Sequence, residues 1–569
     1  MKKIIFSILL VLVLVFPAFA TNHYILAGAT GTGTGADWTN ALTAPPATLV
    51  RGDTYYIADG NYSGYTFNTA VSGTALITIK KCPSSALKVD ACQSVTGWSD
   101  TYGVGQAVFQ YPTSITKTTI NIITSYITFD GVVGSGGDIN SYGFRVKYPA
   151  DGGTASDLWG IGLPATGYPT TTVSNVGIYH VAVEGMGNVA CLNTGNAYYC
   201  CNAGIGGNSS NMANNEIAYN YIYGWQTNLV INAGHDTTVH HNFLDSNSSG
   251  SYCHGQNMSI DGTDNISFYD NVFKNSNIFI MGAHGNIGTN TGTQMYNNIS
   301  DGYQGTQLSG CFVNGGSGAS DVWWGAKFYQ NTFVNLNCGG YGAFFVGNLS
   351  NVTTQKSYAY NNLFYNVVNP GMNNDAPTYT AGGVVHDYNA YLKCTGTYSG
   401  NGTVTAETHG QVDASASNPL NADYTINQPA DAGNAAHVIN TGDAAIIAPP
   451  WNVDAAGNAR PYNLTNPDIG AYEYIGGGVT QYAVTPTLAG TGCTMSLTGV
   501  TQVISGESLQ LTSSCQNGFQ ATWSGSCGGS ASAATCANNV CVTTYTTSAI
   551  NGACGVTMTG GAIPILPWH

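Results

Sequence analysis

The chain has 569 residues, of which 8% are charged and 43% are apolar, and its formal net charge is −15. This balance argues against nucleic acid or an anionic membrane as a partner, because either would need a basic stripe on the surface. The apolar content argues against a disordered chain, and 74 glycines with 36 tyrosines suit an extracellular β protein.

The first 20 residues have the pattern of a secretion signal. MKKIIFSILLVLVLVFPAFA combines two lysines, one apolar run and a small-residue ending, which predicts cleavage before Thr21. The alternative is a single membrane anchor, which is disfavoured because no positive cluster follows the run. We expect a protein that is secreted or held at the extracellular cell surface, with no membrane insertion after signal cleavage.

Fifteen cysteines in an exported chain predict disulfides, and no paired C-x-x-C motifs occur at zinc spacing. Nine of them precede residue 480, so at least one of the nine is unpaired or intermolecular. The other six can close three bridges in fifteen ways: Cys493, Cys515, Cys527, Cys536, Cys541 and Cys554.

A short phrase recurs along the middle of the chain, from IAYNYIY at Ile217 to AYNNLF at Ala359. Its asparagines are separated by 22, 29, 27, 33 and 31 residues. This repeat predicts a right-handed parallel β-helix, whose coils stack about 4.8 Å apart with equivalent residues in register. Asparagine tolerates left-handed turns and can bond the next coil, so we expect a structural ladder: Asn220, Asn242, Asn271, Asn298, Asn331 and Asn362.

A second strand precedes each ladder phrase, as in NLVINAG at Asn228 and NMSIDG at Asn257. Alternation directs Leu229, Ile231, Met258 and Ile260 inward. The intervening polar side chains are then expected to face outward on one sheet and to form the floor of a groove: Asn228, Asn232, Asn257, Ser259, Asp261 and Asn277.

Histidines and carboxylates gather at one edge of this strand over three coils. Alignment on the ladder stacks Asn232 on Asp261 and His235 on Asp264. Such a group suits general acid–base catalysis or a divalent cation, although histidine and aspartate are also ordinary turn residues. The candidate catalytic residues are His254, Asp261 and Asp264, and Asp261 and Asp264 are also the candidate metal ligands. The candidate substrate contacts are Asn228, Asn232, His235, Gln256, Asn257 and His284.

Both ends of the repeat region carry family-like segments. RGDTYYIADGNYSGYTF at Arg51 and SGTALITIK at Ser72 resemble the entry into the first coil of secreted pectate-lyase-like β-helix proteins. HDYNAYL at His386 and WNVDAAGNARPYNLTNPDIGAYEY at Trp451 resemble their last coil and closing segment. The resemblance implies a β-helix over residues 21–474. It implies no single reaction, because this architecture hosts lyases, hydrolases, epimerases and proteins without known catalysis.

Lyases of acidic glycans on this scaffold use a lysine or arginine as base beside a uronate, with Ca²⁺ held by carboxylates. Arg145 and Lys147 in YGFRVKYP are the candidates here, because Phe144 and Val146 point inward between them. Lys274 and Lys327 are expected on a different sheet and rank lower. GHG and RVK look superficially like polygalacturonase motifs, but their order is wrong and no aspartate pair accompanies them.

A glycine linker, IGGGV, follows Tyr474 within residues 475–482, and residues 483–569 resemble a bacterial surface repeat module. We expect this small all-β module to be tied by disulfides and to serve attachment or spacing. Two functions follow from the whole chain. One is a polysaccharide lyase-like enzyme that acts on an acidic glycan, with calcium as the expected cofactor. The other is a non-catalytic surface, adhesion or matrix protein that uses the β-helix as a rigid shaft and binds a polysaccharide or cell-surface glycan.

Overall fold

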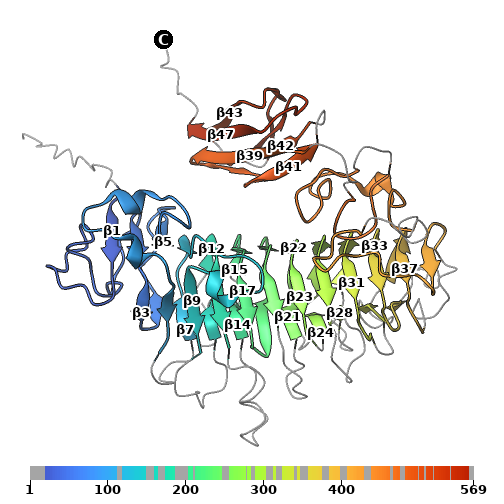
Figure 1. Cartoon of the computed structure of the whole chain (residues 1–569), viewed down its shortest axis with the longest axis horizontal. Coiled ribbons are helices and arrows are strands. Elements are labelled where there is room, and N and C mark those ends of the chain that lie inside the picture. Colours follow the sequence, from blue (N-terminus) through green and yellow to red (C-terminus); the bar gives the residue numbers. More distant parts are fainter. Residues whose placement is uncertain are drawn as a thin grey trace, which may run out of the picture.

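The structure is a computed structural model that describes residues 20–111, 118–148, 159–163, 173–185, 203–208, 212–245, 256–276, 278–282, 289–302, 312–315, 323–338, 342–345, 356–373, 383–396, 407–427, 437–461, 466–474, 481–497, 499–504, 508–516, 518–537 and 540–562. It confirms the expected fold class: a right-handed parallel β-helix is followed by a small disulfide-tied β module (Figure 1).

Three long parallel sheets form the walls of the β-helix, which we call sheets A, B and C. The described strands of sheet A are β1 (Asn22–Ile25), β2 (Thr54–Ile57), β5 (Ile77–Lys81), β8 (Ile127–Asp130), β12 (Val176–Tyr179), β16 (Glu216–Ala218), β19 (Thr238–His240), β22 (Ser267–Tyr269), β26 (Gln294–Tyr296), β30 (Lys327–Tyr329), β33 (Lys356–Tyr360) and β36 (Gly383–Asp387). Those of sheet B are β3 (Gly60–Tyr62), β6 (Ala107–Phe109), β9 (Phe144–Lys147), β13 (Val181–Glu184), β17 (Tyr221–Tyr223), β20 (Phe243–Asp245), β23 (Val272–Lys274), β27 (Ile299–Asp301), β31 (Thr332–Val334), β34 (Leu363–Tyr365), β37 (Ala390–Leu392) and β38 (Gln411–Asp413). Those of sheet C are β4 (Tyr65–Phe67), β7 (Thr118–Ile122), β10 (Trp159–Gly162), β14 (Ala203–Asn208), β18 (Thr227–Asn232), β21 (Gln256–Asp261), β24 (Ile278–Gly282), β28 (Val313–Gly315), β32 (Phe344–Phe345) and β35 (Met372–Asn373).

Shorter elements lie in the connections between the sheets. Two parallel pairs are β11 (Val173–Ser174) with β15 (Met212–Ala213), and β25 (Asn290–Thr291) with β29 (Trp323–Trp324). The described 3₁₀ turns are η1 (Ala91–Ser94), η2 (Asp100–Tyr102), η3 (Ile139–Ser141) and η7 (Ala444–Ile446). In the described residues, no helix has the length and apolar character that a membrane span requires.

Apolar side chains from all three sheets fill the interior of the coils as one continuous core. The side chains predicted to point inward from sheet C are fully buried, at 0 or 1% exposure: Leu229, Ile231, Met258 and Ile260. The alternation of apolar and polar residues therefore identifies the inner face of these strands correctly, because successive side chains of a strand point to opposite faces.

The predicted asparagine ladder runs along the corner between sheets A and B. Each asparagine donates its side-chain amide to Oδ1 of the next one, as in Asn220 to Asn242 and Asn331 to Asn362, both at 3.0 Å. The ladder continues through Asn389 and ends on the carboxylate of Glu407. One detail differs from expectation: the left-handed φ belongs to the residue before each ladder asparagine, for example Tyr219 at 58°.

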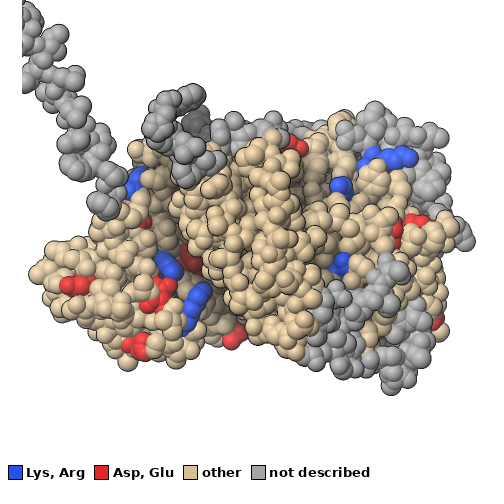
Figure 2. Space-filling view, turned by 90° about the horizontal axis from the view of Figure 1, so that it is seen from above, with Lys and Arg blue, Asp and Glu red and all other residues tan. Residues whose placement is uncertain are grey.

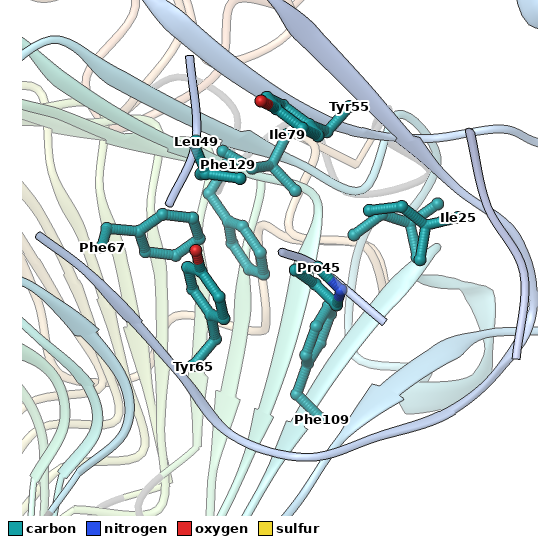
Figure 3. Close-up of a pocket in the computed structure, with 10 residues that line it drawn as sticks. Ile25, Pro45, Leu49, Tyr55, Tyr65, Phe67, Ile79, Phe109 and Phe129 are labelled. Atoms are coloured by element: carbon teal, nitrogen blue, oxygen red, sulfur yellow. The ribbon is translucent and has the colours of Figure 1, made fainter. Parts of the chain in front are cut away.

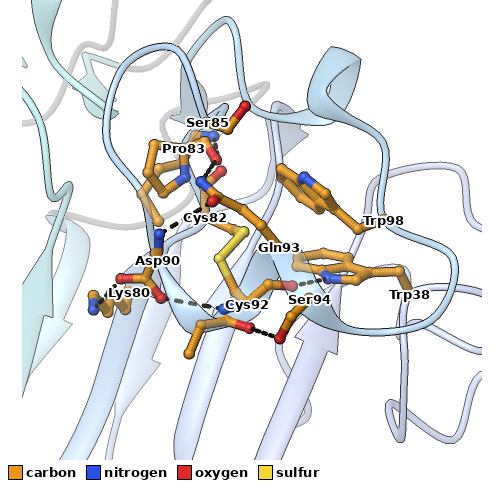
Figure 4. Close-up of a disulfide and its surroundings, with 12 residues drawn as sticks. Trp38, Lys80, Cys82, Pro83, Ser85, Asp90, Cys92, Gln93, Ser94 and Trp98 are labelled. Carbon is orange, nitrogen blue, oxygen red and sulfur yellow. Dashed lines mark hydrogen bonds and ion pairs between the residues drawn. A yellow bond between two sulfur atoms is a disulfide. The ribbon is translucent and has the colours of Figure 1, made fainter.

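A disulfide-tied cap covers the N-terminal end of the core (Figure 4). Cys82 and Cys92 are bridged, and Asp90 closes a capping box at the start of η1. The indole of Trp38 donates to the carbonyl of Cys92 at 2.8 Å, which fixes the cap across a long stretch of chain.

A small apolar cavity lies where this cap meets the first coils, lined by Pro45, Phe67, Phe109 and other core residues (Figure 3). Its two tyrosines bond to the backbone: Tyr65 donates to the carbonyl of Pro46, and the Tyr55 hydroxyl accepts from the N–H of Val50. The cavity is therefore a packing defect at the end of the core, where the polar atoms that a ligand would need are already engaged.

Residues 437–461 and 466–474 cover the outside of the last coils. Their centre is Arg460, which is 4% exposed, pairs with Glu473 at 2.8 Å and donates to the carbonyl of Gly470. Arg460 also reaches Oδ1 of Asn297 on the β-helix at 3.3 Å. This segment thereby closes the outer face of sheet B in the C-terminal coils.

The C-terminal module packs two small sheets around its own core. Its strands are β39 (Gln481–Gly490), β40 (Cys493–Met495), β41 (Thr501–Ile504), β42 (Gln510–Gln516), β43 (Phe519–Gly525), β44 (Ser530–Ala531), β45 (Thr535–Ala537), β46 (Val540–Thr546) and β47 (Cys554–Ala562). Its six cysteines form three bridges, the number expected, and the structure gives their pairing as Cys493–Cys515, Cys527–Cys554 and Cys536–Cys541. In the β-helix, Cys394 keeps a buried thiol that donates to the carbonyls of Phe364 and Leu392.

Candidate functional site

Arg145 and Lys147 project from β9 onto the outer face of sheet B and share one carboxylate. The guanidinium of Arg145 lies 2.7 Å from Oε2 of Glu184, and Nζ of Lys147 lies 3.7 Å from the same oxygen. Glu184 comes from β13, one coil further on, in register with Lys147. All three side chains are between 20 and 33% exposed. We call them the Arg145 cluster; it has two cations and one carboxylate, and Glu184 was not predicted from the sequence.

A column of charged and aromatic side chains continues from this cluster along sheet B. Lys147, Glu184, Tyr223, Asp245 and Lys274 occupy equivalent positions in five successive coils. Lys274 therefore lies on the same sheet as Lys147, which corrects the expectation of a different sheet; its Nζ pairs with Asp301 at 3.2 Å. Lys327 begins β30 in sheet A, as expected for a separate sheet.

The predicted polar floor on sheet C is wrong for Asn228 and Asn257, which are both fully buried. Asn228 donates to Oδ1 of Asn257 at 2.8 Å, and Asn257 donates to the carbonyl of Lys274 at 3.1 Å. The reason lies at the corner between sheets B and C, where the carbonyl that ends a sheet B strand needs a donor. Thr119 of β7 has the same role in an earlier coil, because its hydroxyl donates to the carbonyl of Lys147 at 3.0 Å. These amides stabilise a corner and are inaccessible to a substrate.

Two further sheet C candidates are also buried. Gln256 is 6% exposed and Asp261 is 1% exposed, so neither lies on an open floor as predicted. The predicted register is correct, because Asn232 is level with Asp261. Asn232 and Ser259 are half-buried. The proposed stripe is thus mostly internal packing.

The predicted stacking of His235 on Asp264 is confirmed by a backbone bridge between them. Asp264 is exposed and the side chain of His235 is 44% exposed; His235 pairs with Asp236 at 2.8 Å, and the hydroxyl of Thr291 donates to the Asp264 carboxylate. Within the described parts of the chain, no three histidine, cysteine or acidic side chains converge as metal ligands. His254, His284 and Asn277 lie outside the described residues.

The sequence candidates consequently fall into two separate sets. Arg145 and Lys147 are on sheet B, whereas Asp261 ends a strand of sheet C and Asp264 follows it toward sheet A. Successive coils stack, but the three sheets face different directions, so these two sets do not share one cleft.

A third group, on sheet A, was missed by the sequence analysis. Glu216, His240, His241 and Asp270 come from three successive coils, and we call them the Glu216 cluster. Nε2 of His240 lies 2.9 Å from Oε1 of Glu216, and Nδ1 of His240 lies 2.9 Å from Nδ1 of His241. The available signal was the position of each residue relative to its ladder asparagine. The VHHN phrase places His240 and His241 directly before Asn242, and Asp270 directly precedes Asn271.

No protein-family model matches the chain, and no curated protein matches it. Among solved structures, the chain is similar to the PL6 family alginate lyase AlyGC, at 14% identity and a TM-score of 0.30 over 64% of this chain and 48% of that one. It is also similar to a DFA-IIIase from Arthrobacter chlorophenolicus A6, at 12% identity and a TM-score of 0.31 over 67% of this chain and 87% of that one. An alginate lyase from Paenibacillus sp. str. FPU-7 gives 12% identity and a TM-score of 0.26 over 60% and 93%.

The chain spans about half the length of the first of these structures. At such identities and TM-scores the similarity is a general one in the path of the backbone, and no residue role is transferred from it.

Proposed function

We propose that this protein is a secreted, carbohydrate-active β-helix protein that acts on an acidic glycan as a polysaccharide lyase, at the Arg145 cluster. The supporting observation is that Arg145 and Lys147 converge on a single oxygen of Glu184 at a partly exposed surface. One carboxylate leaves one positive charge uncompensated. A uronate carboxylate fits there, since paired guanidinium and ammonium groups bind planar anions well.

The two cations have different roles in this proposal. Arg145 holds the uronate carboxylate and withdraws charge from the neighbouring carbon, so that its proton becomes easier to remove. Lys147 is the base: once its ammonium has given its own proton to solvent, its amine takes this proton, the bond to the glycosidic oxygen breaks as a carbon–carbon double bond forms, and the departing oxygen takes a proton from water. Half-buried Tyr223, one coil beyond Glu184, offers an aromatic side chain for sugar contact. Calcium stays the expected cofactor, and the assay below measures its effect.

The test is the ultraviolet absorbance of unsaturated uronate, followed with pectate, alginate and glycosaminoglycans, with and without Ca²⁺. We expect a rising signal on one substrate and a loss of about 100-fold or more in Lys147→Ala. Lys274→Ala is the matched control, because Lys274 is in the same column but is engaged by Asp301. A signal that persists in Lys147→Ala, or that falls equally in Lys274→Ala, contradicts the assignment.

The second candidate function is a non-catalytic surface or matrix protein, and one specific observation favours it. The charged column on sheet B pairs within itself, as Lys147 with Glu184 and Lys274 with Asp301, which is the arrangement of a self-supporting shaft. A flat absorbance trace on every glycan from folded protein, combined with retention on an acidic-glycan column, would establish binding without turnover.

A further inference from the structure

The Glu216 cluster lies on the outer face of sheet A and its corner with sheet B, away from the Arg145 cluster. Figure 2 views the molecule from above: uncharged side chains make up most of the described surface, and the Lys, Arg, Asp and Glu side chains are few. Glu216 is 45% exposed and His241 is 34% exposed, whereas His240 between them is only 8% exposed. Solvent therefore reaches both ends of the cluster while its centre is enclosed.

Aromatic rings hold the two imidazoles in place. Tyr269 stacks on His240 with ring centroids 4.6 Å apart, and Tyr219 stacks on His241 at 4.7 Å. The Tyr179 hydroxyl donates to Oε2 of Glu216 at 2.7 Å, which fixes the other end. Such immobilised side chains are characteristic of preorganised sites.

The hydrogen bonds determine where the protons are. Burial alone raises the pKa of Glu216, but hydrogen bonds from His240 and Tyr179 and the histidine charges outweigh it, so the net pKa is lowered and the carboxylate is ionised. His240 must then carry a proton on Nε2, because a lone pair there would face the carboxylate. When both rings are neutral, His241 donates its Nδ1 proton to Nδ1 of His240, and the lone pair of His241 lies on Nε2.

A proton that arrives at Nε2 of His241 can therefore be passed inward. The proton on Nδ1 of His241 moves to His240, and the positive charge comes to lie beside Glu216. A second proton is resisted, since burial and then the charge of His240 lower the pKa of His241 to about 3. The two histidines thus act together as a base that takes up one proton.

Asp270 supplies the complementary group. Its Oδ2 lies 3.7 Å from Nε2 of His241, and its side chain is 10% exposed. Burial, reinforced by the charge of Asp454, raises the pKa of Asp270 well above its ordinary value against opposing contributions from Asn297 and Arg460. A neutral carboxylic acid beside a base is a hydrogen-bond donor for a developing oxyanion.

We propose that the Glu216 cluster is a second active site that hydrolyses an O-acyl ester, such as an acetyl group on a sugar, with His241 as general base and Asp270 as oxyanion donor. Water attacks the acyl carbon, its proton passes to Nε2 of His241, and the Nδ1 proton moves to His240. The tetrahedral intermediate collapses, and the departing alkoxide takes a proton back from His241. The products are the carboxylic acid and the alcohol, and no oxidant or metal is needed. Glu216 and His240 are positioning residues.

The experiment measures p-nitrophenyl acetate hydrolysis by the full chain as a function of pH. We expect kcat/KM to fall by about 100-fold in His241→Ala and to be unchanged in His409→Ala, an exposed histidine that also pairs with a carboxylate. Glu216→Gln should lower kcat with little change in KM and shift the acidic limb of the profile to lower pH, whereas Glu216→Asp should restore some of both. The charged and titratable groups around the imidazoles that bear on this profile are Asp130, Tyr179, His180, Tyr219, Tyr269, Asp454, Arg460 and Tyr472.

A second measurement keeps the proposal testable if the variants fold poorly. In ¹⁵N spectra of the unaltered protein, His241 should show an unprotonated Nε2 and a protonated Nδ1 at neutral pH. The proposal is overturned if His241→Ala retains the activity, if His409→Ala loses it equally, or if Nε2 of His241 carries the proton.

Discussion

Asn389 donates both its backbone N–H and its side-chain amide to the carboxylate of Glu407, at 3.1 and 3.0 Å. Every earlier ladder asparagine uses the amide oxygen of the next coil as acceptor, so the last one needs a substitute. Glu407 provides it, and Tyr391 and His386 bond to the same carboxylate at 2.7 and 2.6 Å. The ladder is thereby terminated by an acceptor whose side chain is fully buried.

Replacing Glu407 with alanine should lower the free energy of unfolding by about 3 kcal/mol, because four donors lose a buried acceptor. Glu407→Gln should cost less, since one oxygen remains. Urea unfolding, monitored by hydrogen exchange in the last coils, measures the free energy of unfolding of both variants. Val412→Ala, at an exposed position on β38, is the control and should change stability by less than about 0.5 kcal/mol. Equal losses in Glu407→Ala and Val412→Ala would show that the ladder needs no terminal acceptor.

Gly204→Ala should destabilise the β-helix by about 2 kcal/mol through overpacking. A Cβ at Gly204 would lie 2.4 Å from Cγ2 of Ile222 and 2.5 Å from the carbonyl oxygen of Asn228, inside the corner between sheets B and C. Gly552→Ala is the control, because nothing lies within 4 Å of its added Cβ. The melting temperatures of the two variants give the comparison. A Gly204→Ala protein as stable as the control would show that the Cα of Gly204 does not face the corner between sheets B and C.

Stability should fall as pH rises from about 4 to 8, because carboxyl groups near Arg460 are more readily protonated in the folded state than in the unfolded state. Burial raises the pKa of Asp468 to about 6 and that of Glu473 to about 8. Across this window the folded state therefore binds more protons than the unfolded state. The stabilisation that results is greatest below the pKa of these carboxyl groups in the unfolded chain, and it is lost above their pKa in the folded protein. Melting temperature against pH measures the slope. Asp468→Asn should flatten it below about pH 6, and an unchanged slope in that variant would disprove the assignment.

Reducing agent should unfold the C-terminal module before the β-helix. The module has a small core and three disulfides, whereas the β-helix has an extended apolar core that all three of its sheets contribute to. Each disulfide contributes about 2–4 kcal/mol by restricting the unfolded chain. Limited proteolysis with and without dithiothreitol should release fragments of residues 481–562 first. Simultaneous digestion of the module and the β-helix would show that they unfold together.

The repeat carried most of the information needed to predict the fold. Six asparagines at equivalent local positions set the register of the coils they belong to, because parallel stacking brings equivalent residues together. The acceptor at the end could not be predicted, since Glu407 lies 18 residues beyond Asn389 and belongs to no repeated phrase. The inward Asn228 was also missed, because alternation within a strand does not describe the corner that precedes it.

The candidate site was only partly predictable. Alternation correctly placed Arg145 and Lys147 on one outer face, but Glu184 joins them from the next coil. The Glu216 cluster could have been found by counting back from the ladder: Glu216 lies four residues before Asn220, and His240 lies two before Asn242. The sequence does not show which of these neighbouring side chains form hydrogen bonds, because this depends on the side-chain rotamers and on the aromatic rings that restrict them.

The asparagine ladder also separates two properties of this solenoid that are usually linked, its length and its surface. β17 and β18 are joined by three residues, whereas β27 and β28 are joined by eleven, yet both pairs belong to coils with the same asparagine corner. An insertion between sheets B and C therefore leaves the neighbouring coils undisturbed. A lineage, or an engineer, can duplicate a coil to lengthen the molecule or replace a connection to change what it recognises, and neither alteration constrains the other.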